Sequence, residues 1–434
     1  MHVVYERCCG LDIHKKLVVA CLFTPGTGGQ PRKEIRTFGT MTDDLLKLAD
    51  WLAAHEVVHV AMEATGVYWR SIFNLLEGTF ELMLVNPQHM KAVPGRKTDV
   101  KDCEWLADLL RHGLVRGSFV PDRPQRELRE LTRYRTALVR ERSAEVNRLQ
   151  KVLEGANIKL ASVASNIVGK SGREILAALV AGTTDPALLA QLAKKKLRAK
   201  IPQLERALAG RVEAHQRFLL ARQLAHLDDL DRLLGEVSGE IGRRLAAESD
   251  EPPAKEVSMT AAERPAGQPG AEAVERLQTI PGVGQRIAEV LVAEIGTDMS
   301  RFPTAAHLAS WAGMCPGNNE SAGKRKSGRT RKGSPWLRTA LIEAAQAAGR
   351  TKDTYLAAQY HRLACRRGAK RAAVAVGHTI LTVAYALLKT QTPYHELGRH
   401  YYDERDRRAS ERRLVRRLAD LGYEVTLRPA EPAA

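Results

Sequence analysis

Residues 1–120 contain three strand patterns in succession, followed by a helix–strand–helix–strand–helix alternation. The first two strand patterns are the apolar runs CCGLDI and LVVACLF, joined by the polar turn HKK, and the third is the alternating segment EIRTFGT. Segments with helical spacing then alternate with the strands VVHVAME and ELMLVNP. This order predicts a mixed-sheet α/β domain over 1–120 whose first two strands form a hairpin. Thr42 and Asp43 are the expected N-caps of the first helix, and Gly113 should end the last.

The pattern changes after residue 120. Over 121–248, Gly and Pro become sparse and leucines recur at heptad-like spacing, with a second long helical run at about 203–246. This predicts an antiparallel helical hairpin or coiled coil that dimerises, or a helical bundle packed on the first domain. Residues 249–273 are rich in Pro, Ala, Gly and Glu and predict a flexible linker. Residues 274–434 predict a helical, basic C-terminal domain whose tail, ERDRRASERRLVRRLADLGYEV, forms an amphipathic basic helix.

The chain carries a formal net charge of +17, which favours a polyanionic partner, either nucleic acid or an anionic membrane surface. No stretch approaches the ~20 apolar residues that a membrane span requires, so we expect no membrane partner. The first ten residues lack the layout of a signal peptide. The six scattered cysteines form no CxxC pair, which argues against a zinc site and a secreted disulfide framework and favours reduced thiols in the cytoplasm.

Four acids in the first domain have the placement of a metal site. Asp12 interrupts an apolar strand. Burying a carboxylate there costs roughly several kcal/mol of folding free energy unless the group is paired or binds a cation. Glu63 ends a strand, and Asp99 and Asp102 lie three residues apart at the start of a helix, so they face one side. Carboxylates converging in this way are suited to two Mg²⁺ ions for phosphoryl transfer. Helix capping by Asp99 and Asp102 and a solvated strand end at Glu63 are the alternatives.

The C-terminal domain has two features suited to nucleic-acid binding. The segment LQTIPGVGQRIAEVLVAEIG has a helix-hairpin-helix pattern in which Gly282 and Gly284 allow close backbone approach, so that the N–H groups of the next helix can bind a phosphate. A glycine-punctuated segment that we expect to be a mobile loop follows, with six cations and no acid; an ordinary αα turn and a solvated loop are the alternatives. The cations are Lys324, Arg325, Lys326, Arg329, Arg331 and Lys332.

The segments GLDIHK, AMEATGVYW, RKTDVKDCEWLADLLRHGL and GMCPGNNESAGKRKSGR resemble, in this order, the DEDD transposases of the insertion sequence 110 family, which includes the Piv and MooV invertases. The resemblance covers the first domain and most of 274–395. It implies a RuvC-like, RNase H-type first domain in which Asp12, Glu63, Asp99 and Asp102 bind Mg²⁺. It also implies a nucleophilic serine at Ser321, where the motif reads Ser-Ala-Gly rather than Ser-Gly or Ser-Ser-Gly.

Taken with this resemblance, the sequence predicts a DNA recombinase that moves an insertion sequence through a covalent phosphoserine at Ser321, with Ser327 and Ser334 as the alternative nucleophiles. The resemblance further implies a structured guide RNA. Because the acids and the serine lie on separate domains, we expect them to meet between the subunits of a homo-oligomer, dimer or tetramer, in a composite active site. We expect a bacterial, nucleoid-associated protein in the cytoplasm. Two other functions remain open: a junction nuclease that uses the acids and water, and a non-catalytic nucleic-acid-binding scaffold.

Overall fold

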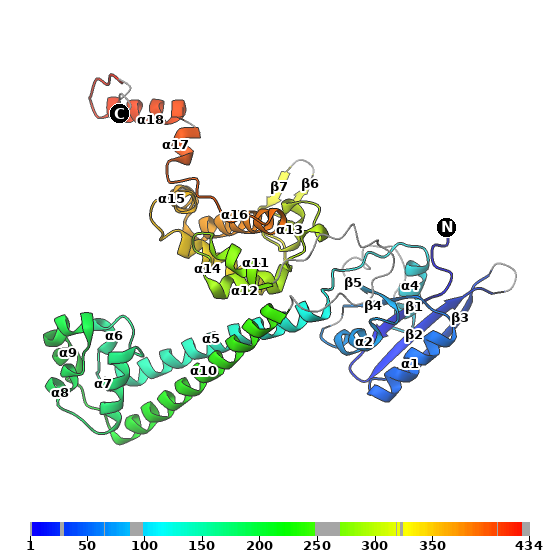
Figure 1. Ribbon diagram of the computed structural model, residues 1–434, viewed down its shortest axis with the longest axis horizontal. Helices are drawn as coiled ribbons and strands as arrows, with labels where there is room; N and C mark the ends of the chain where they lie inside the picture. Colours follow the sequence, from blue (N-terminus) through cyan, green and yellow to red (C-terminus); the bar gives the residue numbers. More distant parts are fainter. Residues whose placement is uncertain are drawn as a thin grey trace. The chain divides into compact units, whose positions relative to one another are not determined.

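The computed structural model describes residues 2–26, 30–64, 66–86, 99–247, 270–317, 319–321, 324–405 and 407–427. The chain forms two compact units, Met1–Pro121 and Asp122–Ala434, which are drawn in Figure 1 and considered separately below.

The first unit is built on a five-stranded sheet with the order β3-β2-β1-β4-β5. The strands are β1 (Cys8–Ile13), β2 (Leu17–Thr24), β3 (Arg32–Gly39), β4 (His59–Glu63) and β5 (Glu81–Val85). The central strand β1 pairs antiparallel with β2 and parallel with β4. The predicted mixed α/β class and the predicted β1–β2 hairpin are therefore confirmed. The RuvC-like assignment stays a prediction.

Three helices cover the two faces of this sheet. Helices α1 (Thr42–Ala54) and α2 (Trp69–Leu76) share one apolar cluster with the sheet, and α4 (Asp99–Arg111) contributes to a separate one. The predicted N-caps of α1 were wrong by one or two residues, because the cap is Met41, whose carbonyl accepts from Leu45 N–H, and no side chain caps the helix. Gly113, with φ of 66°, follows the end of α4 as predicted.

The second unit begins with a long helical hairpin, which we call the arm. Helix α5 (Arg123–Gly155) lies beside α10 (Ala214–Ala247), as Figure 1 shows. The ion pair of Glu127 near the start of α5 with Arg244 near the end of α10, at 2.6 Å, shows that the helices are antiparallel. The antiparallel hairpin is thus observed, whereas dimerisation stays a prediction.

The far end of the arm carries a small helical module that the sequence did not predict. It contains α6 (Leu160–Val163), α7 (Lys170–Val180), α8 (Pro186–Gln191), the 3₁₀ helix η2 (Lys195–Lys200) and α9 (Ile201–Leu208). The predicted continuous run from about 203 to 246 was wrong, because the chain leaves the helix between α9 and α10. Gly210 lies there, and a Cβ on it would meet the Ala156 carbonyl oxygen at 2.4 Å.

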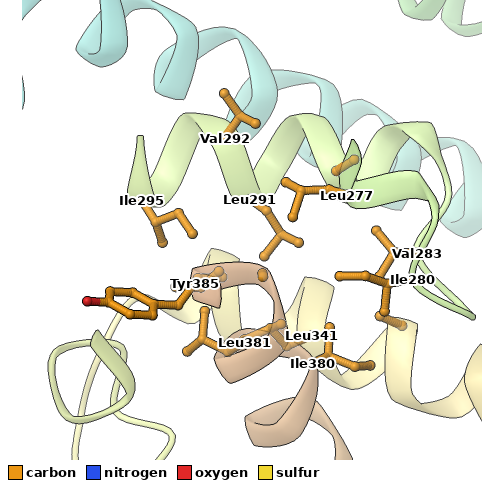
Figure 2. Close-up of a cluster of buried hydrophobic side chains, with 14 of the residues drawn as sticks. Leu277, Ile280, Val283, Leu291, Val292, Ile295, Leu341, Ile380, Leu381 and Tyr385 are labelled. Atoms are coloured by element: carbon orange, nitrogen blue, oxygen red, sulfur yellow. The ribbon is translucent and has the colours of Figure 1, made fainter. Parts of the chain in front are cut away.

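The remaining helices share one apolar core. They are α11 (Gly270–Gln278), α12 (Gln285–Ile295), η3 (Met299–Arg301), α13 (Ala305–Trp311), α14 (Pro335–Ala348), α15 (Tyr355–Arg367) and α16 (Ala369–Thr390), and α17 (Tyr401–Arg405) and α18 (Arg407–Asp420) follow. Figure 2 shows Leu291, Leu341 and Leu381 pointing toward one another, while Val292 points toward the arm. The predicted helical character of this region is confirmed.

Two sequence expectations need correction or restriction here. Most of the predicted linker 249–273 lies outside the described residues, but α11 already begins at Gly270, because Ala273 is fully buried in the core. Helix α16 is long and apolar enough to cross a membrane by length and composition. Its Val376 and Ile380 are fully buried, as expected for the central helix of a packed core.

Candidate functional site

Asp12 and Glu63 lie at the same edge of the sheet. Strands β1 and β4 run parallel with Leu11 opposite Met62, so Asp12 and Glu63 are the next residues on neighbouring strands. Alternate residues of a strand face the same side of the sheet. Cys8 on β1 and Ala61 on β4 both belong to the cluster that includes α4, so Asp12 and Glu63 project on that same side.

Helix α4 brings its first turn to this edge. It runs opposite to β1, because the Cys8 thiol contacts the Ala107 carbonyl at 3.7 Å while Gly10, further along β1, contacts Cys103. A Cβ on Gly10 would lie 2.5 Å from the Cys103 carbonyl oxygen, so only glycine lets the helix pack this closely. The turn that begins at Asp99 therefore approaches the edge where β1 ends.

The structure thus brings the predicted acids together at the level of the backbone. Asp12, with its side chain 13% exposed, forms an ion pair with His14 Nε2 at 3.1 Å. Glu63 and Asp102 are half-buried and engaged in interactions of their own. Asp99 lies in α4, but its side chain is outside the described residues.

The donor set consists of carboxylates, which are the hard oxygen ligands that Mg²⁺ prefers. Asp12 supports this fit, because its carboxylate is largely buried and has His14 as an ion-pair partner, a residue that is charged only when protonated. Among the side chains that the structure describes, no group of three or more ligating residues is close enough to hold an ion. Asp12, Glu63 and Asp102 are among these described side chains, so the three alone do not form such a group, and the side chain of Asp99 lies outside the described residues.

Buried thiols lie behind the acidic edge. Cys8, Cys9, Cys21 and Cys103 are fully buried, and all six cysteines of the chain are free thiols. Burial raises the pKa of the Cys8 thiol to about 12 and raises that of Cys9 as well. The thiols of Cys8 and Cys9 are therefore neutral at physiological pH, and they act as packing residues rather than as ligands or nucleophiles.

The two glycines between α11 and α12 have different roles. Gly282 has φ of 87°, and a Cβ on it would lie 2.4 Å from the Ala344 carbonyl oxygen of α14, so its close approach is to the protein's own core. Gly284 directly precedes α12 with open space around it and no side-chain cap. The N–H groups at the start of α12 are therefore accessible beside Gly284. Nucleic-acid binding by either glycine stays a prediction.

The sequence predicted that the basic segment is a loop, but the segment contains a short hairpin of β6 (Asn319–Ser321) and β7 (Lys324–Ser327). Ser321 pairs in register with Lys324. The base of the hairpin is held by the Gly317 N–H, which donates to the Arg329 carbonyl at 2.8 Å. These backbone hydrogen bonds order a segment whose composition alone predicts mobility.

The predicted cations of this hairpin are exposed wherever their side chains are described. Lys324, Arg329, Arg331 and Lys332 are solvent-accessible, whereas the side chains of Arg325 and Lys326 are outside the described residues. Such a row of accessible cations is suited to binding a phosphate backbone.

The two alternative nucleophiles have structural roles. The Ser334 hydroxyl donates to Glu294 Oε2 at 3.0 Å and accepts from the Leu337 N–H at 3.3 Å, which caps α14. The Ser327 hydroxyl accepts from the Arg329 N–H at 3.1 Å. Both hydroxyls thus have hydrogen-bond partners in the local fold, whereas the side chain of Ser321 lies outside the described residues, so its role as the nucleophile stays a prediction.

A buried ionic network, which the sequence reasoning missed, lies where the arm meets the C-terminal helices. Glu294 is 1% exposed and accepts from Arg133 of the arm at 2.8 and 3.0 Å and from Ser334. Arg129 donates to the Ala293 carbonyl at 2.8 Å. The network therefore joins the arm, the end of α12 and the start of α14. Its signal in the sequence was the pair of acids that interrupts the apolar helix IAEVLVAEIG.

Comparisons with known proteins agree with this arrangement. A family model described as a transposase matches residues 9–158, and one described as a transposase of the IS116/IS110/IS902 family matches 274–361. A probable family 20 transposase of Pseudomonas aeruginosa is 26% identical over 344 residues, 77% of this chain and 85% of that protein. The transposase for the element IS1111A of Coxiella burnetii is 26% identical over 356 residues, 79% of this chain and 81% of that protein.

A pilin gene-inverting protein of Moraxella bovis is 30% identical over 121 residues, which is 27% of this chain and 37% of that protein. The range of the first family model includes the four acids, and the range of the second includes Ser321.

Proposed function

Because the chain belongs to the IS110 family of transposases, we propose that it is a site-specific DNA recombinase that mobilises an insertion sequence through a covalent phosphoserine at Ser321. The observation that carries the proposal is the convergence of Asp12, Glu63 and the first turn of α4 at one sheet edge. In this proposal the first unit has a RuvC-like, RNase H-type fold, which the mixed five-stranded sheet centred on β1 supports.

The family implies the use of a divalent metal, and the carboxylates fit Mg²⁺. Asp12, Glu63, Asp99 and Asp102 would hold two such ions. When bound, the ions would stabilise the charge that develops on the scissile phosphate. The protein's own contribution is to fix the carboxylates on rigid elements, because Asp12 and Glu63 lie on paired strands and α4 is packed against Gly10.

In the proposed reaction the Ser321 hydroxyl attacks the scissile phosphorus. A bond forms between Oγ and phosphorus while the bond from phosphorus to the 3′-oxygen breaks, and the proton lost by the serine is matched by the one that the 3′-oxygen gains. The products are a phosphoserine and a free 3′-hydroxyl. Attack by the 3′-hydroxyl of the exchanged strand reverses these bond changes and releases the serine, so that rejoining needs no ATP.

The exposed cations of the hairpin support the binding of DNA backbone near Ser321, and the accessible start of α12 supports a further backbone contact elsewhere on the second unit. The acids and the serine belong to different units, which is consistent with an active site assembled from two protomers of a dimer or tetramer. The net charge of +17 is consistent with a guide RNA as a second polyanion. A nucleoid-associated, cytoplasmic location follows from this function.

The test is incubation with DNA carrying the ends of the element, the cognate RNA and Mg²⁺, followed by a denaturing gel. The wild-type chain should retain a labelled strand, and Ser321→Ala and Asp12→Asn should retain none. Ser327→Ala, in the same hairpin, is the matched control and should retain it. Cleavage by Ser321→Ala would favour the junction nuclease that uses water. If neither the wild type nor any variant cleaved a strand, and Asp12→Asn left DNA binding unchanged, the result would favour the non-catalytic scaffold.

A further inference from the structure

The module at the far end of the arm, which we call the tip module, comprises residues 156–213. It has its own apolar core, in which Leu160, Ile175 and Leu204 are fully buried. Its residues lie almost entirely outside the ranges that the two family models match, 9–158 and 274–361. Neither family model therefore assigns this module a role.

One surface of the tip module is strongly basic. The segment KKKLRAK, residues 194–200, contains five cations and no acid, and all five are exposed. Lys194 pairs with Glu174, and the Lys200 ammonium donates to the Val163 carbonyl at 3.2 Å. Within the parts of the chain that the structure describes, no ion pair to an acid is found for Lys195, Lys196 or Arg198.

The protein holds these cations on a fixed turn. The Lys194 N–H donates to the Ser171 hydroxyl at 2.9 Å, and the Leu197 N–H closes the turn onto the Lys194 carbonyl at 3.1 Å. Leu197 packs against the module's core. Lys195 has φ of 48°, a left-handed backbone conformation that residues other than glycine adopt only at a cost in conformational free energy. The fold thus maintains a basic turn that burial of the core alone does not require.

We propose that the basic turn Lys194–Lys200 is a second contact surface for the backbone of duplex DNA, separate from the serine hairpin. The chain belongs to a family that acts on DNA, and unpaired exposed cations bind phosphates without reading sequence. The absence of aromatic side chains from the segment disfavours stacking on single-stranded bases and leaves the duplex backbone as the matching ligand.

The arm sets the distance between the two contacts. Leu128 lies in the core of the C-terminal helices and Leu149 in the core of the tip module, both on α5. At 1.5 Å per residue the helix separates them by roughly 30 Å, which corresponds to about nine base pairs of duplex. We therefore take about ten base pairs as the scale of the span between the serine hairpin and the basic turn.

The test compares two full-length double variants that each lose two positive charges. The tip variant is Lys195→Asn/Lys196→Gln, in which asparagine tolerates the left-handed backbone. The control is Arg232→Gln/Arg243→Gln on α10, whose arginines pair with acids of their own helix. Affinity is measured against salt concentration on mixed-sequence DNA duplexes of about 40 and about 8 base pairs and on an RNA duplex of about 40 base pairs, and the two DNA lengths lie on either side of the predicted reach.

On the long DNA duplex, the tip variant should bind more weakly, and the slope of log K against log salt should become shallower by about 1.8, or 0.9 for each lost phosphate contact. On the short duplex it should match the wild type, and the control should keep the wild-type slope on both. An unchanged salt slope of the tip variant on the long duplex would overturn the proposal, and so would a loss of affinity on the short duplex equal to that on the long one. A larger loss on the RNA duplex would reassign the surface to RNA. Circular dichroism melts of both variants should coincide with the wild type.

Discussion

Removing the carboxylate of Glu289 should strongly destabilise the second unit. Glu289 pairs with Arg135 of the arm, and the two side chains are only 3% and 4% exposed. Glu289 also accepts from Gln285 at 2.9 Å, whereas Nη2 of Arg135 is buried without a hydrogen-bond partner. The arginine therefore depends on this one carboxylate for its neutralisation.

In Glu289→Ala the guanidinium stays buried with no counter-charge. Breaking a buried pair in this way costs about 3–5 kcal/mol of unfolding free energy. Replacing both partners, as in Arg135→Met/Glu289→Leu, removes the charge as well as its partner, so the double variant should be no less stable than the wild type, within about 1 kcal/mol. As a control, Glu236→Ala breaks the exposed pair with Arg232 and should cost about 0.3–0.5 kcal/mol.

Urea unfolding followed by circular dichroism measures these differences, and the relevant transition is the one that melts the arm and the C-terminal helices. We expect the midpoint to fall sharply for Glu289→Ala, to recover in the double variant, and to be nearly unchanged for Glu236→Ala. A loss below about 1 kcal/mol in Glu289→Ala, or a double variant as unstable as the single one, would refute the reasoning.

Three further predictions concern the glycines and thiols. Gly10→Ala should push α4 off the sheet, because the added Cβ would clash with the helix backbone. This should lower the unfolding free energy of the first unit by about 1–3 kcal/mol and abolish metal-dependent cleavage, and an unchanged melting curve with normal cleavage would contradict it. Gly282→Ala should lower the melting temperature of the second unit, while Gly284→Ala should leave it unchanged, and equal melts would show that the α14 contact is unimportant. With a thiol reagent at pH 8, Cys365 should react quickly and Cys8 only on unfolding, as mass spectrometry of the labelled peptides would show. Because burial raises the pKa of Cys8 from 9.0 to about 12, the contribution of this thiol to the unfolding free energy should be complete below pH 9 and should be lost as the pH rises toward 12.

The sequence predicted the first unit well because its strands are short apolar runs, or in one case an alternating segment, that are separated by polar turns and helices. Asp12 stood out because a carboxylate inside an apolar strand needs a partner. The sequence did not reveal how close α4 lies to β1, because that distance depends on the missing side chain of Gly10. The placement of Asp102 near the sheet edge follows from this contact and not from a motif.

The second unit was harder to predict for two physical reasons. The helices of the tip module are short, and the 3₁₀ turn of lysines has the composition of a solvated loop. The strands β6 and β7 are three and four residues long and contain little β-favouring sequence, so only backbone pairing reveals them. The Arg135–Glu289 pair joins residues 154 positions apart, a distance at which helical periodicity gives no information.

The central claim is that the Ser321 hydroxyl and the carboxylates of the first unit act on one phosphodiester. The most direct measurement is tandem mass spectrometry of the protein–DNA adduct after nuclease and protease digestion. The account predicts a nucleotide remnant joined through phosphate to Ser321, formed only when Asp12 is intact and Mg²⁺ is present. A remnant on Ser327 or Ser334, or strand exchange with no protein-bound nucleotide, would contradict it.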